Sequence, residues 1–99
     1  MSELSRDEEA YWAIFEELIE NVNAKSENTD LGIINSALLN AAARFNAFYV
    51  AVNSESKKDL IEDKEETTER FLGEYKKQFS ANLEDYIENY KVYLRVEDE

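Results

Sequence analysis

Four glutamates in the second half of the chain are spaced so that they could bind a metal ion. They are Glu62, Glu65, Glu66 and Glu69. Residues three or four apart share one face of a helix. Helical di-iron sites also use histidine ligands, however, and the chain contains no His. The alternating Asp/Asn and central Gly of a calcium-binding loop are also missing. Because lysines and an arginine alternate with these acids, we predict a solvated charged face, with no metal and no cofactor.

A polar stripe interrupts an otherwise apolar segment in the first half of the chain. Ser36, Asn40 and Arg44 follow one another at four-residue steps. A guanidinium group can bind the carboxylate or phosphate of an anionic ligand through two parallel hydrogen bonds. Alternatively, a poorly solvated Arg44 pairs with an acid inside the protein, and we favour this interpretation. The candidate acids are Glu16, Glu20 and Asp85.

Tyrosines recur near the end of the chain, where they could stack on nucleic-acid bases. They are Tyr75, Tyr86, Tyr90 and Tyr93. Single-strand binding also needs a positively charged groove, and the basic residues here are outnumbered by acids. The tyrosines are therefore expected in a core or a subunit interface.

Composition excludes several classes of function. The net charge is −12, from 11 basic and 23 acidic residues, and there is neither Cys nor His. The charge opposes direct binding to nucleic acids and to anionic membranes. Without Cys and His, the chain lacks a thiolate nucleophile and the usual general base at neutral pH. We predict that the protein is not an enzyme.

Residues 1–99 are expected to form a single all-α domain, a three-helix bundle. The chain has no Pro and only two Gly, and the apolar residues recur at three- and four-residue steps. The expected helices span residues 6–23, 32–53 and 56–94, followed by an acidic tail at 96–99. Ser5 with Glu8 and Ser56 with Asp59 have capping spacing, and Thr29 or Asp30 caps the middle helix. The middle helix is apolar nearly all round, so we expect it, with Phe45 in its core, at the centre.

The third helix is expected to be longer than its neighbours and to join two copies of the chain. The apolar spacing of this helix continues through Ser80. The alternative is a break near Ser80 that would form a fourth helix and give a compact monomer. A continuous helix overhangs the bundle and leaves an apolar stripe that a twofold homodimer would cover. The candidate interface residues are Leu72, Tyr75, Phe79, Leu83, Tyr86, Tyr90 and Tyr93.

Two segments resemble a known protein family. They are Ala41-Ala42-Ala43-Arg44-Phe45-Asn46-Ala47-Phe48 and Asn82-Leu83-Glu84-Asp85-Tyr86-Ile87. Together with the loop Ser26-Glu27-Asn28-Thr29, they resemble a family of small proteobacterial proteins known only as a domain of unknown function. The resemblance covers residues 10–94. It implies a bacterial, cytoplasmic helical protein and brings no catalytic residue.

These features favour a non-enzymatic protein that acts in protein–protein interaction or as a structural adaptor. Its expected partners are a second copy, another protein, or both, without direct contact to nucleic acid or membrane. The alternative is an acidic nucleic-acid mimic that inhibits a DNA- or RNA-binding protein. Residues 1–9 lack the basic start and apolar run of a secretory signal, so a cytoplasmic location is expected.

Overall fold

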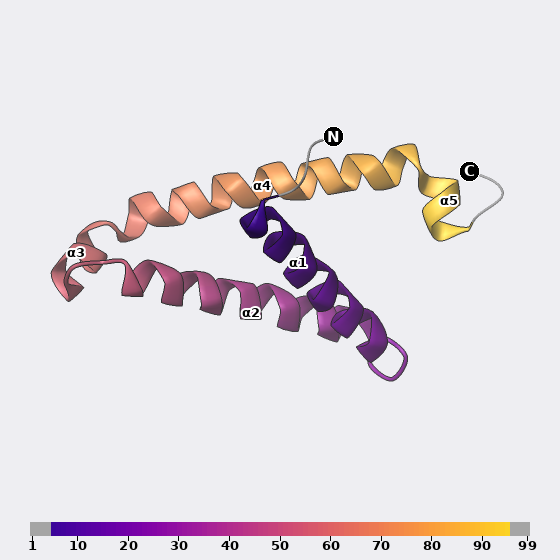
Figure 1. Cartoon of the computed structure of the whole chain (residues 1–99), viewed down its shortest axis with the longest axis horizontal. Coiled ribbons are helices and arrows are strands. Elements are labelled where there is room, and N and C mark those ends of the chain that lie inside the picture. The colour runs from indigo at the N-terminus through magenta and orange to yellow at the C-terminus, as the bar shows by residue number, and fades with distance from the viewer. Residues whose placement is uncertain (1–4, 96–99) are drawn as a thin grey trace. The chain divides into compact units, whose positions relative to one another are not determined.

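The chain folds into α-helices joined by short turns, as Figure 1 shows for the computed structural model. The structure describes residues 5–95, and no strand occurs within that range. The expected all-α class is therefore confirmed. The chain divides into two units, residues 1–52 and 53–99. The acidic tail expected at 96–99 lies outside the described residues.

The first unit begins with α1 (Arg6–Lys25), whose start is fixed by its own side chains. The Ser5 hydroxyl accepts a hydrogen bond from the backbone N–H of Glu8 at 3.1 Å, and the Glu8 carboxylate accepts one from the Ser5 N–H at 3.0 Å. This is the capping box that the spacing predicts. Acidic residues fill the first turn and Lys25 the last, which suits the helix dipole at both ends.

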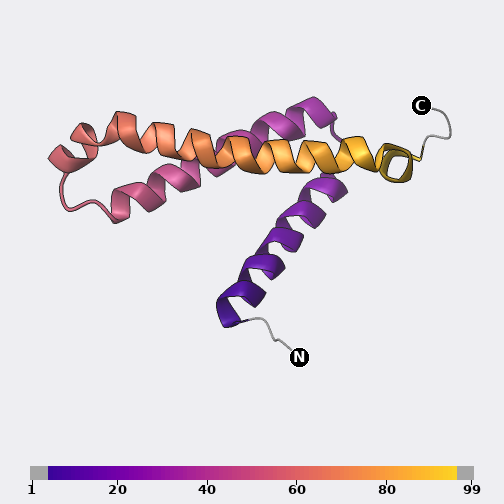
Figure 2. The same ribbon diagram turned by 90° about the horizontal axis from the view of Figure 1, so that it is seen from above.

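A short turn joins α1 to α2 (Leu31–Val52). The Asp30 carboxylate caps α2 by accepting a hydrogen bond from the Gly32 N–H at 2.9 Å. Figures 1 and 2 show that α1 diverges from α2 with distance from this turn. The two helices therefore contact each other near the turn, where Val22 and Ile34 are half-buried.

The second unit contains α3 (Lys57–Glu62), α4 (Lys64–Glu88) and α5 (Tyr90–Leu94). Ser56 caps α3 by accepting a hydrogen bond from the Asp59 N–H at 3.1 Å. The prediction of one helix over 56–94 was wrong, because interruptions occur at Asp63 and Asn89. The alternative break near Ser80 is not observed, since α4 continues through this residue.

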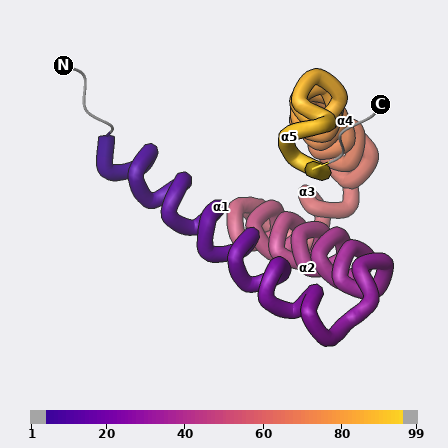
Figure 3. Tube along the Cα trace, turned by 90° about the vertical axis from the view of Figure 1, so that its right-hand side faces the viewer, coloured from indigo at the N-terminus to yellow at the C-terminus, as the bar shows by residue number. Residues whose placement is uncertain are grey.

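The helix is interrupted at Asn89, whose backbone leaves the helical region at φ −113° and ψ 32°. Its side-chain amide donates to the backbone carbonyl of Asp85 at 3.1 Å and to the Asp85 carboxylate at 2.9 Å. The bond to the carbonyl does not by itself end a helix, because Asn82 donates to the Gln78 carbonyl at 2.7 Å within uninterrupted α4. Figures 1 and 3 show the result: α5 crosses the end of α4 instead of continuing its axis. Arg95 then ends α5 in the left-handed backbone region, with φ 55°.

Neither unit buries any of its described residues. The expected burial of the second helix is therefore not observed. Phe45, placed in the core from the sequence, is 64% exposed, and its ring lies 5.8 Å from that of Phe48 on the same helix. A pair of helices that diverge from a shared turn has no second layer against which to bury both faces of α2.

Candidate interaction surface

Five apolar side chains form a continuous line along α4, which we call the α4 stripe. They are Leu72, Tyr75, Phe79, Leu83 and Tyr86. Steps of three and four residues place all five on one side of the helix. Each is between 47% and 59% exposed, and none is charged. The rings of Tyr75 and Phe79 stack on each other, with centroids 5.8 Å apart and planes 18° from parallel.

The other two candidate interface residues, Tyr90 and Tyr93, belong to α5. Because α5 turns away from the axis of α4, they do not extend the stripe in a straight line. The Tyr93 ring packs against Tyr86 with centroids 4.6 Å apart. Its hydroxyl donates a hydrogen bond to the Asp85 carboxylate at 2.7 Å. This bond and the carboxylate charge raise the pKa of Tyr93 above its ordinary value of 10.0.

Sequence analysis did not identify the cluster of Asp85, Asn89 and Tyr93. The signal was present, because an acid, an amide and a phenol follow one another at four-residue steps. Four-residue spacing predicts that side chains on a helix meet, but it does not show that the helix ends between them. From the sequence, Asp85 was predicted only as a candidate partner for Arg44.

The polar stripe of Ser36, Asn40 and Arg44 lies along α2, and all three side chains are exposed. Arg44 forms no ion pair with Glu16 or Glu20 in the first unit. The internal ion pair of Arg44 stays a prediction, as does the alternative of an anionic ligand.

The four glutamates considered as metal ligands are exposed. Glu62 is the last residue of α3, and the other three lie in α4, after the break between the two helices. Glu62 approaches Lys58 at 3.9 Å, one helical turn earlier. Within residues 5–95, no group of three or more acidic side chains is placed to hold a metal ion. An exposed pair with this spacing contributes a few tenths of a kcal/mol at most.

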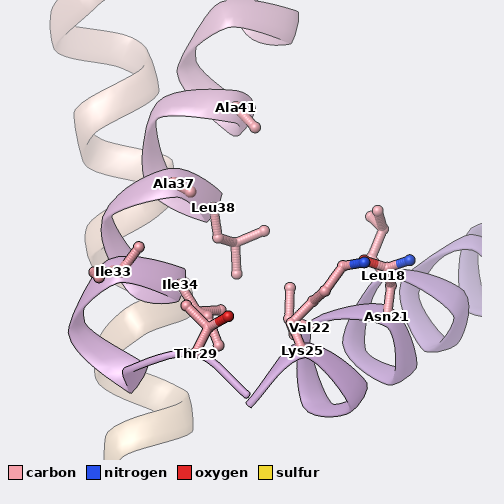
Figure 4. Close-up of a pocket in the computed structure, with 10 residues that line it drawn as sticks. All are labelled: Leu18, Asn21, Val22, Lys25, Thr29, Ile33, Ile34, Ala37, Leu38 and Ala41. Carbon is pink, nitrogen blue, oxygen red and sulfur yellow. The ribbon is translucent and has the colours of Figure 1, made fainter. Parts of the chain in front are cut away.

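A groove of about 410 Å³ lies between α1 and α2 near their turn. Figure 4 shows Leu18 and Val22 of α1 facing Ile34 and Leu38 of α2 across it. Ala37 and Ala41 line the α2 side, where their small side chains leave room. The sequence indicated that the alanines permit close approach of a neighbour, but not that a groove forms beside them.

No helix within the described residues is both long and apolar enough to cross a membrane.

Comparison with known proteins supports the resemblance noted in the sequence. A family model described as "Protein of unknown function (DUF3144)" matches residues 11–87, from the second turn of α1 almost to the end of α4. No match was found among curated proteins or among solved structures. Since the matched residues make up most of the chain, the protein belongs to the DUF3144 family.

Proposed function

We propose that this protein is a non-enzymatic interaction protein that binds another protein chain through the α4 stripe. One observation supports the proposal: five neighbouring apolar side chains stay about half exposed on a helix in which eleven of 25 residues are charged. Contiguous exposed apolar patches are typical of protein interaction sites. The charges elsewhere on α4 keep the chain soluble until the stripe is covered.

Covering the stripe would supply a substantial driving force. Each buried aromatic or leucine side chain contributes about 1.5–3 kcal/mol relative to its exposed state. Half of that gain is still available at each stripe position, since the side chains are about half exposed. The stacked rings of Tyr75 and Phe79 also present a surface that is already ordered, which lowers the entropic cost of docking.

We further propose that the helices complete their packing as a bundle in which α2 is central. α2 carries one charged residue, Arg44, among 22 and is apolar nearly all round. In this arrangement the protein has no catalytic role and no cofactor, and it works in the cytoplasm.

The test compares two variants that add the same charge on opposite sides of α4. Phe79→Asp places a carboxylate in the stripe, whereas Ala81→Asp, two residues away, places one on the far side of the helix. Each variant and the wild type would serve as bait for affinity capture at low and high salt. Circular dichroism would verify that both variants keep their helix content.

We expect wild type and Ala81→Asp to retain the same proteins at high salt, and Phe79→Asp to lose them. Apolar docking resists salt, whereas electrostatic mimicry of a nucleic acid is screened by it. Loss of every captured protein at high salt would favour the acidic mimic. Equal capture by all three baits would contradict the proposed role of the stripe.

A further inference from the structure

We infer that the partner of the α4 stripe is a second copy of this chain, lying antiparallel with the twofold axis at Phe79. The inference rests on the proposed function and names the partner of that surface. It follows from the order of the stripe residues. The successive steps along the stripe are three, four, four and three residues, so the stripe has the same spacing in both chain directions.

A twofold interface requires that surface to be self-complementary. If residue i of one copy contacts residue j of the other, then j must also contact i. In an antiparallel pair centred on Phe79, that residue meets Phe79 of the partner subunit. Tyr75 meets Leu83 of the partner subunit, and Leu72 meets Tyr86 of the partner subunit. Every stripe residue therefore has an apolar counterpart, and no stripe residue faces a charged one.

Charge favours the antiparallel direction over the parallel one. Residues 62–69, at the junction of α3 and α4, carry five acids and one base: Glu62, Asp63, Glu65, Glu66 and Glu69 against Lys64. A parallel pair would bring this run alongside the same run of the second copy, which like charges oppose. In an antiparallel pair centred on Phe79, the two acidic runs lie at opposite ends, each beyond the last residue of the other copy's α4.

The stripe offers about the smallest surface that a specific dimer needs. Its five residues are between 47% and 59% exposed. With about 150–250 Å² for each large apolar side chain, they leave roughly 500 Å² to be covered on each copy. The pair would therefore bury about 1,000 Å², which is about the least that a specific interface requires.

The experiment measures distances between two copies without changing the stripe. The chain has no native Cys, so a single introduced Cys can carry a spin label. Arg70→Cys and Glu88→Cys lie nine residues before and after Phe79, and Ala81→Cys lies two residues after it. All three positions are on the side of α4 away from the stripe, at 100° per residue. Pulsed electron paramagnetic resonance would give the label-to-label distance in each purified full-length variant.

We expect Arg70→Cys and Glu88→Cys to give the same long distance and Ala81→Cys to give a clearly shorter one. Nine residues on either side of the axis separate the labels by about 27 Å along the pair, against about 6 Å for position 81. One distance common to all three variants would indicate a parallel pair and overturn the inference. Unequal distances for the two outer labels would show that the axis does not lie at Phe79, which would also overturn it.

Sedimentation equilibrium of the wild type, Phe79→Asp and Ala81→Asp gives an independent test. We expect dimers for the wild type and Ala81→Asp, and an 11.5 kDa species for Phe79→Asp. If the wild type is itself an 11.5 kDa monomer, the second copy is excluded, and the stripe is covered by a different protein or by the first unit of the same chain. The two proposals can fail separately. A monomeric wild type that still captures a protein through the stripe would overturn the second copy alone, whereas equal capture by all three baits would overturn the proposed function.

Discussion

The two long helices distribute charge in opposite ways. In α2 the only charged residue is Arg44, so apolar side chains occupy nearly the whole circumference. In α4 eleven of 25 residues are charged, and the apolar side chains are concentrated in one stripe. A helix with a single stripe needs one neighbour, whereas a helix that is apolar all round needs neighbours on several sides. The sequence therefore indicates one contact surface for α4 and a central position for α2.

The largest expected effect tests the central position of α2. Replacing Phe45 with Ala should lower the free energy of unfolding by about 3–5 kcal/mol if neighbouring helices enclose this ring in the assembled protein. The measurement is guanidinium chloride unfolding, read from the midpoint at an unchanged m-value. A loss under about 1 kcal/mol would mean that Phe45 keeps the 64% exposure seen in its own unit, and that α2 is not central.

The next effect tests the single stripe of α4. Tyr75→Ala should weaken self-association by at least about 30-fold, because a central aromatic at an interface is worth about 2 kcal/mol or more. Lys77→Ala is the matched control on the same helix. Lys77 pairs with Glu74 at 3.5 Å, and both side chains are exposed, so its removal should change the dissociation constant little. Equal weakening by both variants, measured by sedimentation, would argue against a stripe confined to one side.

The glycines of the two helices offer a smaller test of local packing. A Cβ added at Gly73 in α4 meets no atom within 4 Å, so Gly73→Ala should stabilise the protein by about 1 kcal/mol. A Cβ at Gly32 in α2 would lie 2.9 Å from the Asp30 carboxylate oxygen that caps the helix. Gly32→Ala should therefore gain little, since the cap must shift and a lost cap costs about 1 kcal/mol.

Thermal unfolding of both glycine variants measures these changes. An equal gain at the two positions would show that the Asp30 cap contributes nothing to α2.

Local features of this fold could be predicted from the sequence, whereas the partners of its helix faces could not. The capping box of Ser5 and Glu8 and the cap at Ser56 were predicted correctly, because each depends on residues three apart in the chain. The interruption at Asn89 was missed, because Asn82 makes the same bond to the carbonyl four residues earlier without ending the helix. Periodicity along α2 and α4 identifies apolar faces, but it carries no information on what covers them.

In the candidate interaction surface, too, local features could be predicted from the sequence and the arrangement of separate helices could not. The α4 stripe could be read from spacing alone, since every one of its residues lies on one uninterrupted helix. Tyr90 and Tyr93 seemed to continue it only because a single helix was assumed over 56–94. The groove between α1 and α2 depends on the angle at which the two helices diverge, and that angle is set by the turn at residues 26–30.

A smaller effect is expected at Arg44, the one charged residue of α2. Arg44→Met should change the free energy of unfolding by no more than about 0.5 kcal/mol if the side chain stays exposed and unpaired with Glu16 or Glu20. A loss of about 3 kcal/mol or more would instead reveal an acid left unpaired inside the assembled protein. Thermal shifts with inorganic phosphate test the ligand alternative. A shift in the wild type that Arg44→Met abolishes, with stability unchanged, would support anion binding.

The smallest expected effect concerns the end of α4, where the charged residue Asp85 precedes Tyr86, the last residue of the α4 stripe. The raised pKa of Tyr93 means that its neutral phenol, which donates to Asp85, is favoured in the folded protein. This contact should therefore stabilise α5 fully below pH 10 and be lost as the pH rises through the folded-state pKa. A pH titration of tyrosinate absorbance should show a late component from Tyr93. Tyr93→Phe should remove that component, and Asp85→Asn should move it to lower pH by removing the carboxylate charge. If the late component persists unchanged in both variants, the phenol does not bind Asp85, and α5 is held at the end of α4 by Asn89 and the Tyr86 ring contact alone.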